Sequence, residues 1–358
     1  MGKQNFTRRK FIGRAAAGIG LGMFGQCTTL PGSEAATSLD REILRRGVKV
    51  ASVDLQHLYP EKSIERRIKN VLARMENAAA FRPDIISVPE TFNTSYVDEE
   101  RSYAEIAEDE TNPGPVISEM GDFAAKNNCY VICPVVTTNN GKFYNSAVLL
   151  DRKGAVSGVF HKVHPVDTEI EDGGGIIPGP VRPPVFETDF GKIGIQICFD
   201  ANWFESWSLL KEDGAEIVFF PSQFPGGRIL NFFAWKNEYY IVSSTGEDAR
   251  VIDVTGLNIC TSTFQSGFTW TALNLEKVNV PTFPGKYKMG DILSKYGEKV
   301  RIRDYWDAGD GTGDGAGHMT IESLDPELFV RDILQDFDIP TNREELEVEE
   351  KIQAKYRV

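Results

Sequence analysis

The sequence predicts an α/β protein whose helices and mixed β-sheets are stacked as a layered sandwich. Apolar, strand-like runs alternate with helical segments between about residues 46 and 280. Some of these runs are separated by helices, as in parallel strand pairs, whereas others are joined by short turns, as in antiparallel hairpins. The hairpins argue against a purely parallel barrel, and no internal repeat of fixed period is present.

The first half of the chain supplies the predicted strands and helices of one βα arrangement. Strands are expected at 48–55, 84–90 and 129–136, and helices at 61–81 and near 114–127. The helix at 61–81 has apolar residues at helical spacing, which places five side chains on one face: Ile64, Ile68, Val71, Leu72 and Met75.

The second half adds a hairpin and further βα units. The segment "FYNSAVLLDRKGAVSGVFHK" is typical of a hairpin that turns at Arg152-Lys153-Gly154. Strands follow at 193–199, 216–221 and 239–244, with helices at 202–213 and 228–238. We therefore expect one domain over residues 46–280.

Residues 281–358 differ in composition and are expected to form a C-terminal extension of loops and two helices. Asp325-Pro326 is a suitable N-cap and first position for one helix, and Thr341 with Glu344 fits a capping box for the other. The loop "DAGDGTGDGAGH" could hold a calcium ion through Asp307, Asp310 and Asp314, but its spacing does not fit the EF-hand pattern, so a solvated turn is expected. We predict no metal and no organic cofactor.

Composition excludes some partners and places the cysteines. Acidic residues outnumber basic ones by 52 to 39 and give a net charge of -13, which argues against nucleic acid or anionic lipid as a standing partner. Cys129 and Cys133 lie in one predicted strand about 13 Å apart, so they cannot bridge each other and are expected to be buried thiols.

The first 35 residues are expected to be an export segment. Basic residues precede a short apolar run rich in glycine and alanine: Arg8, Arg9, Lys10 and Arg14. The segment resembles a twin-arginine signal, which predicts an exported, periplasmic protein, with a disordered basic tail as the alternative. A lipid anchor at Cys27 is disfavoured because Gln26 stands where a small residue is needed. The apolar run is too short to predict a membrane span.

Three chemically competent residues stand where predicted strands end. Glu90 follows "DIISVP", Lys162 ends "AVSGVFHK" and Cys198 ends "IGIQIC". Hydrolysis of an unactivated carbon–nitrogen bond needs a base, a cation or donor for the developing anion, and a nucleophile, and these three side chains could supply them. The Lys162 charge could also favour the Cys198 thiolate. Taken singly, each also fits a structural role: a helix cap, a surface lysine and a buried thiol.

The text around these residues resembles the three signature segments of the nitrilase superfamily of carbon–nitrogen hydrolases, in the same chain order. The segments are "VPETFNTSY", "YNSAVLLDRKGAVSGVFHKVHP" and "PVFETDFGKIGIQICFDANWFE". The resemblance implies an αββα sandwich, usually paired into a homodimer or higher homo-oligomer. It implies that Glu90 is the general base, Lys162 the oxyanion-stabilising lysine and Cys198 the nucleophile.

The resemblance also implies supporting residues. The backbone N–H of Phe199 is expected to share the oxyanion hole with Lys162. Glu169 matches a second glutamate that holds the lysine in some members, and Glu171 is its alternative. One departure is "FAWKN", where Phe233 and Lys236 occupy positions that are often charged in the family.

The expected substrate is a small amide or ureido (N-carbamoyl) compound. Family members that cleave amides or carbamoyl groups tend to have an aromatic residue and an aspartate after the cysteine, as in Phe199-Asp200. Nitrile-cleaving members tend to have tryptophan and glutamate there, so nitrile hydrolysis is the second reading. Residues that follow the strand ends are the pocket candidates: Tyr96, Asn202, Trp203, Ser222, Gln223 and Phe224.

Other classes of protein remain open on the sequence alone. An exported, catalytically inactive binding protein could use the same fold, and a twin-arginine signal also fits a protein that carries a metal cofactor. A cysteine peptidase is disfavoured because neither His161 nor His164 has a recognisable Cys/His context.

Overall fold

The computed structural model describes residues 44–99, 101–172, 175–304 and 318–357. The predicted export segment, with Cys27, lies outside the described residues. So does the aspartate loop with Asp307, Asp310 and Asp314.

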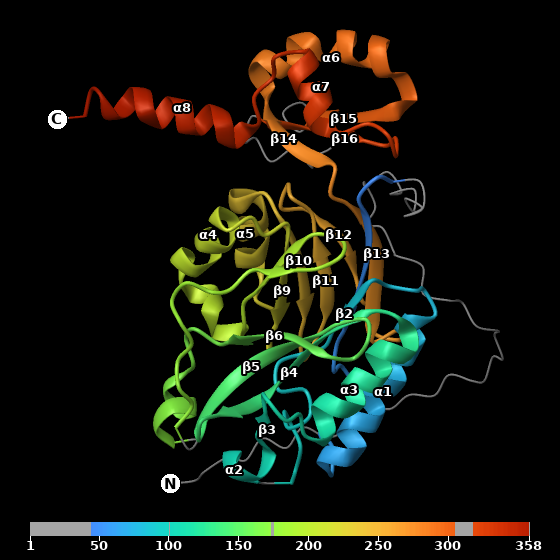
Figure 1. The fold of residues 1–358 in the computed structure, drawn as a ribbon, viewed down its shortest axis with the longest axis vertical. Coiled ribbons are helices and arrows are strands. Elements are labelled where there is room, and N and C mark those ends of the chain that lie inside the picture. The colour runs from blue at the N-terminus through green and yellow to red at the C-terminus, as the bar shows by residue number, and fades with distance from the viewer. Residues whose placement is uncertain (1–43, 100, 173–174, 305–317, 358) are drawn as a thin grey trace, which may run out of the picture.

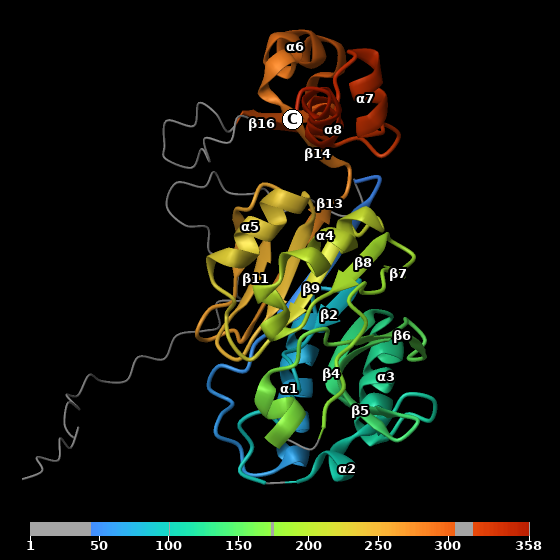
Figure 2. The same ribbon diagram turned by 90° about the vertical axis from the view of Figure 1, so that its left-hand side faces the viewer.

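Two β-sheets pack face to face, and helices cover the outer face of each, which confirms the predicted layered sandwich (Figures 1 and 2). Helices α1 (Ile64–Ala79) and α3 (Pro115–Asn127) lie on the first sheet. Helices α4 (Phe204–Glu212) and α5 (Arg228–Asn237) lie on the second. The order of layers is therefore αββα.

The first sheet has the strand order β13-β1-β2-β4-β5-β6, and β3 also pairs with β4. Strands β1, β2 and β4 run parallel, whereas β4, β5 and β6 form successive antiparallel hairpins. The short helix α2 (Tyr103–Ile106) precedes β3. The strand bounds are β1 (Gly47–Val53), β2 (Ile85–Ser87), β3 (Glu108–Asp109), β4 (Tyr130–Asn139), β5 (Lys142–Leu150), β6 (Val156–His161) and β13 (Phe268–Asn274).

The second sheet has the order β12-β11-β10-β9-β8-β7, with β8, β9 and β10 parallel. Its outer strands β7, β11 and β12 pair antiparallel. The bounds are β7 (Phe186–Glu187), β8 (Lys192–Ile195), β9 (Ile217–Pro221), β10 (Tyr240–Ser244), β11 (Ala249–Ile252) and β12 (Asn258–Thr261).

Alternate residues of both sheets fill the space between them. The first sheet contributes Val50, Ile132 and Phe160, and the second contributes Ile195 and Phe219, all of them fully buried. Complete burial of such a side chain stabilises the fold by about 1.5–3 kcal/mol. This shared core fixes the two sheets against each other, and with them the strand ends that carry Glu90, Lys162 and Cys198.

The C-terminal part forms a small unit with its own sheet and core. Strands β14 (Lys277–Pro281), β16 (His318–Ser323) and β15 (Val300–Asp304) make a three-stranded antiparallel sheet. Its buried core includes Val280, Ile292, Met319, Ile321 and Ile333. Around it lie α6 (Thr282–Tyr296), α7 (Val330–Asp336) and α8 (Asn342–Ala354), the last extending away from the body (Figure 1).

This unit differs from the expected loops and two helices. Helix α6 and the sheet are additional, and β14 begins inside the range expected for the main domain. The capping box of Thr341 and Glu344 is confirmed at α8. The expected helix start at Asp325-Pro326 is wrong: these residues form a turn, and α7 begins at Val330.

Most main-domain elements lie where the sequence predicts them. The structure adds one hairpin and shortens one predicted strand. The β5–β6 hairpin turns at Arg152-Lys153-Gly154 as expected. A second hairpin, β4–β5, turns at Asn140 and Gly141, whose φ angles of 51° and 74° suit a two-residue turn. The predicted strand 193–199 ends early, at Ile195. Within the described ranges, none of the helices has the length and apolar character needed to cross a bilayer.

Candidate active site

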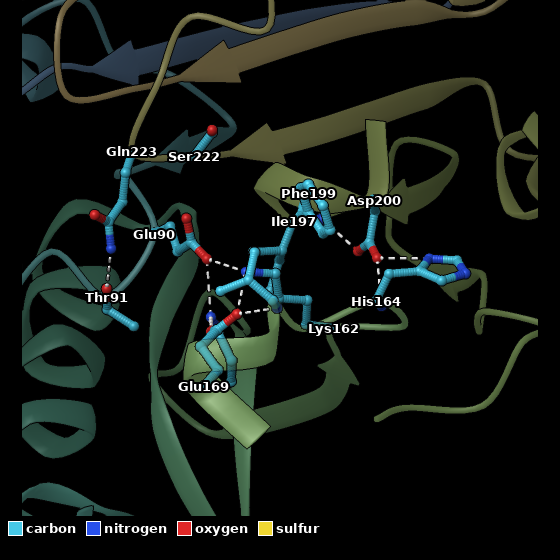
Figure 3. Close-up of polar contacts among 12 residues, drawn as sticks. Glu90, Thr91, Lys162, His164, Glu169, Ile197, Phe199, Asp200, Ser222 and Gln223 are labelled. Carbon is cyan, nitrogen blue, oxygen red and sulfur yellow. Dashed lines mark hydrogen bonds and ion pairs between the residues drawn. The ribbon is translucent and has the colours of Figure 1, made fainter. Parts of the chain in front are cut away.

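The three residues singled out at strand ends converge in the structure. Figure 3 shows Glu90 and Lys162 side by side. Glu90 follows β2, Lys162 follows β6 and Cys198 follows β8. Strands β2 and β6 belong to the first sheet and β8 to the second. Both sheets therefore contribute residues to the site, each from just beyond the end of a strand. The exposed fractions are 2% for Glu90, 2% for Lys162 and 7% for Cys198, so the group is sheltered from water.

Lys162 is held between two carboxylates. Its Nζ lies 2.7 Å from Oε1 of Glu90 and 2.8 Å from Oε2 of Glu169. Burial lowers the pKa of Lys162, but the Glu90 and Glu169 carboxylates outweigh it and raise that pKa above its usual range. The ammonium therefore stays charged, and its direction is fixed by both partners.

Glu169 supplies the second carboxylate that contacts Lys162. It lies in a π-helical turn, Thr168–Asp172, and its Oε2 also accepts a hydrogen bond of 2.8 Å from the backbone N of Val166. Glu171 is exposed, and no contact joins it to Lys162 within the described part of the chain.

Asn145 also joins the two carboxylates that hold Lys162. Its Nδ2 donates to Oε1 of Glu90 at 2.8 Å and to Oε1 of Glu169 at 2.6 Å, and the residue is 2% exposed. The sequence analysis did not single out this residue. The available signal was a polar amide that directly precedes the largely apolar run "SAVLL" of β5.

Cys198 occupies a backbone conformation that side chains seldom adopt. Its φ is +48°, and it starts a 3-10 turn, Cys198–Asn202. This turn begins three residues after the last residue of the strand, and it places the thiol close to the Glu90 carboxylate and the Ser222 hydroxyl, both of which act on its pKa. Such strain at a side chain placed against a base is typical of a functional position.

The thiol is neutral in the resting site. Burial raises the pKa of Cys198 first, and the nearby Glu90 carboxylate raises it further, whereas Lys162 and Ser222 lower it by less. Lys162 favours the thiolate, as expected, but burial and the Glu90 carboxylate outweigh its effect on the Cys198 pKa. The thiol must lose its proton during attack, and Glu90 is the group placed to receive it. Oε2 of Glu90 is buried and accepts no hydrogen bond from another nitrogen or oxygen of the described residues.

Asp200 anchors the turn that carries Cys198 and was also not singled out. Its Oδ2 accepts from the backbone N of Ile197 at 2.9 Å. Its Oδ1 accepts from the backbone N of His164 at 2.7 Å and lies 3.1 Å from the His164 Nδ1. One buried carboxylate thus connects the segment after Lys162 to the segment before Cys198, as Figure 3 shows.

The pocket candidates fall into two groups. The Ser222 hydroxyl lies close enough to the thiol to lower its pKa, and the Tyr96 hydroxyl lies close enough to Glu90 for that carboxylate to contribute to its raised pKa. Phe224 is 43% exposed, and its backbone N donates to the Ser222 hydroxyl at 3.1 Å.

Asn202 and Trp203 have other contacts. The Asn202 side chain donates to the carbonyl of Phe199 at 3.0 Å. Trp203 stacks on His164 with ring centroids 4.0 Å apart and makes an edge contact with Phe199. The backbone of Phe199 follows Cys198 in the 3-10 turn.

Two further expectations concern the thiols of Cys129 and Cys133 and the segment "FAWKN", which differs from the family pattern. Cys129 and Cys133 are buried and unbridged, as expected. Phe233, which stands at an often charged position, stacks on Trp207 with centroids 4.2 Å apart, so this position has become part of the α4–α5 core. Within the part of the chain that the structure describes, no cluster of three or more metal-binding side chains occurs.

Comparison with known proteins gives a match over the same region. The sequence profile of the carbon–nitrogen hydrolase family matches residues 49–249. The yeast (Saccharomyces cerevisiae) omega-amidase NIT3 is 26% identical over 194 residues, which cover 51% of this chain and 66% of that protein. The deaminated glutathione amidase of Synechocystis is 35% identical over 91 residues, 24% of this chain and 34% of that protein. The chain thus matches less than two thirds of the length of these relatives.

A solved structure shares the fold. Saccharomyces cerevisiae Nit3, a member of branch 10 of the nitrilase superfamily, superposes with a TM-score of 0.58 at 18% identity, covering 69% of this chain and 95% of that one. The likeness confirms the expected αββα architecture.

Proposed function

Because the chain belongs to the carbon–nitrogen hydrolase family of the nitrilase superfamily, we propose that it hydrolyses a small amide through a cysteine acyl-enzyme. One observation carries the proposal: a neutral thiol, a carboxylate with a free oxygen and a charged lysine meet in one sheltered site. These are the nucleophile, the base and the cation that amide cleavage needs.

The first half of the reaction forms the acyl-enzyme. The Cys198 sulfur attacks the amide carbon while its proton passes to Glu90, and the carbonyl oxygen becomes an oxyanion. The Lys162 ammonium and the backbone N–H of Phe199 stabilise that oxyanion. When it collapses, the carbon–nitrogen bond breaks, the nitrogen takes the proton from Glu90, and ammonia or an amine leaves.

The second half releases the acid. Glu90 removes a proton from water, and the resulting nucleophile attacks the thioester carbon. The carbon–sulfur bond then breaks, the proton returns from Glu90 to the sulfur of Cys198, and the acid departs. Because Glu90 exchanges one proton in each half, the site returns to its starting state without any added reductant or oxidant.

A substrate panel tests this function. Purified protein should release ammonia from simple amides or carbamoyl amino acids, and Cys198→Ala should abolish the release. Cys133→Ala, which removes a buried thiol elsewhere in the core, is the matched control and should retain activity. Nitriles in the same panel test the second reading. Ammonia release by Cys198→Ala at the wild-type rate contradicts the proposal, and an unreactive wild-type thiol with no turnover favours an inactive binding protein.

We also propose that the protein is exported and forms a homodimer or higher homo-oligomer. Export is supported by the basic and apolar text of the first 35 residues. Fractionation of the native host, followed by N-terminal sequencing, tests the first proposal, and intact first residues in the cytosol contradict it. Light scattering of the purified protein tests the second, and a monomer at micromolar concentration contradicts it.

A further inference from the structure

Two tyrosines lie against each other at the rim of the candidate active site. Tyr59 belongs to the loop after β1, and Tyr96 to the segment after Glu90. Their ring centroids are 5.1 Å apart with 33° between the ring planes. The residues are 39% and 50% exposed, so parts of both rings are open to a ligand.

The backbone holds both tyrosines in this arrangement. Tyr96 has a φ of +55°, and its carbonyl accepts hydrogen bonds from the backbone N of Glu61 at 3.0 Å and from Nη2 of Arg67 at 3.4 Å. The same Nη2 donates to the carbonyl of Leu58, next to Tyr59, at 3.1 Å. One fully buried guanidinium therefore connects the two loops, and the ring pair is organised before any ligand arrives.

The loop between β10 and β11 brings a carboxylate to the same rim. Gly246 packs so closely that an added Cβ would lie 2.6 Å from the carbonyl oxygen of Gln223 and 3.7 Å from a ring carbon of Tyr96. The next residue, Glu247, is exposed, and its charge helps to raise the pKa of the Tyr96 hydroxyl, after burial and Tyr59.

The neighbouring charges are already paired. Asp248 lies 3.0 Å from Nε of Arg250, and the same guanidinium donates to the carbonyl of Pro225. Among the residues that the structure describes, none forms an ion pair with Glu247. This rim therefore presents one unpaired negative charge beside two exposed rings.

The rim is continuous with the catalytic residues. Gln223, which follows Ser222, donates from Nε2 to the hydroxyl of Thr91 at 3.2 Å, and Thr91 follows Glu90 (Figure 3). The Glu90 carboxylate also contributes to the raised pKa of the Tyr96 hydroxyl, so that hydroxyl lies within electrostatic reach of Glu90. A substrate whose carbonyl lies at Cys198 can thus extend along Tyr96 toward Glu247.

We propose that the substrate carries a cationic group, such as a primary ammonium, which binds over Tyr59 and Tyr96 and next to Glu247. This cation subsite rests on the amide hydrolysis proposed above and names its substrate class. Aromatic ring faces attract cations, and a nearby carboxylate adds a Coulomb attraction. A carboxylate-ended substrate is disfavoured because Glu247 repels it at the rim.

Three amides of equal acyl length test the subsite. These are δ-aminovaleramide, δ-hydroxyvaleramide and glutaramate, which end in an ammonium, a hydroxyl and a carboxylate. At low salt, kcat/KM for the ammonium amide should exceed that for the hydroxyl amide by roughly tenfold, as expected for one cation–π contact plus one exposed charge pair. The preference should shrink as salt is added.

Variants assign the preference to its residues. Glu247→Gln should lower the ammonium-to-hydroxyl ratio to within about threefold of unity, and Glu247→Lys should favour glutaramate. Tyr59→Leu should lower the same ratio. Glu119→Gln, which removes an exposed glutamate from α3, is the matched control and should leave the ratio unchanged.

The outcomes separate the two proposals. Turnover of all three amides with equal kcat/KM, or with glutaramate preferred by the wild type, overturns the cation subsite and leaves amide hydrolysis in place. A wild-type preference that survives Glu247→Lys also overturns the subsite. If no amide is turned over and Cys198 forms no adduct, the proposed function fails and the subsite fails with it.

Discussion

Replacement of Asn145 tests whether the two carboxylates must be held in place as well as charged. Asn145 donates one hydrogen bond to Glu90 and one to Glu169, at 2.8 and 2.6 Å. Asn145→Ala removes both while leaving the nucleophile, the base and the lysine chemically intact. Any loss of rate therefore reports the positioning of Glu90.

The structure sets the size of the effect. A hydrogen bond to a charged group contributes about 1.5–3 kcal/mol, so two of them give an upper bound of about 3–6 kcal/mol. Lys162 still holds both carboxylates at 2.7 and 2.8 Å, so we expect the lower part of that range. Because about 1.4 kcal/mol corresponds to a tenfold change in rate, kcat/KM should fall by about 100- to 1000-fold.

Asn145→Asp should change how activity depends on pH. The introduced carboxyl would lie between two carboxylates in a buried site, so its pKa should be raised. In the protonated form it can still donate one hydrogen bond, whereas the charged form repels both neighbours. Activity of this variant relative to wild type should therefore increase as pH falls, and that of Asn145→Ala should not.

Initial-rate ammonia assays from pH 5 to pH 9 measure both variants, with circular dichroism to verify folding. Asn139→Ala is the matched control, since Asn139 donates to the Glu110 carboxylate at 2.7 Å without contacting Glu90 or Lys162. Wild-type kcat/KM in a folded Asn145→Ala protein, or an identical pH profile for the two Asn145 variants, would refute the positioning role.

Three further predictions concern the thiols and the core. The pH at which iodoacetamide alkylates Cys198 at half its maximal rate should move down in Glu90→Gln and up in Lys162→Met, because the carboxylate raises and the ammonium lowers the thiol pKa; the reverse order would contradict these signs. Trp207→Ala should lower the free energy of unfolding by about 3–5 kcal/mol in urea titrations, since the ring is fully buried, and a loss below about 1 kcal/mol would be inconsistent with the α4–α5 core. Burial raises the pKa of Cys129 from 9.0 to about 12, so its contribution to stability is complete below pH 9 and is lost as pH rises toward 12. Cys129→Ala should therefore show a shallower fall in urea midpoint over that interval, and an unchanged slope would argue against it.

Periodicity and turn chemistry predicted much of the fold. The apolar face of α1 was visible as Ile64, Ile68, Val71 and Met75, and all four are buried against the first sheet. The hairpin at Arg152-Lys153-Gly154 was visible because its turn residues separate two strand-like runs. Such patterns are local, and local patterns can be read without knowing the partner.

Features that depend on one backbone angle or on distant pairing could not be predicted in the same way. The run "IGIQIC" is apolar except for Gln196, and its composition did not show that the strand ends at Ile195 and that Cys198 has a positive φ. The sheet of the C-terminal unit pairs Val300 with Ser323 and Lys277 with Glu322. The paired residues are far apart in the sequence, so no short turn between the strands indicates that they pair.

The residues of the site also fall into those that local sequence could predict and those that it could not. Glu90, Lys162 and Cys198 could be selected because each is a reactive group at the end of a predicted strand. The sequence around each also resembles a signature segment of the nitrilase superfamily. Asn145 and Asp200 were missed because their roles consist of hydrogen bonds to groups that lie 55 and 36 residues away. Only the folded chain brings those partners together.

Mass spectrometry of a trapped intermediate tests the central claim most directly. Wild-type protein and Glu90→Gln would each be mixed with a slowly hydrolysed amide, quenched in acid and digested. The account predicts that the wild-type peptide with Cys198 gains the mass of the acyl group, that hydroxylamine removes this mass, and that Glu90→Gln gains far less in the same time. Continued amide hydrolysis with the acyl group on another residue, or with no covalent adduct under these conditions, would contradict it.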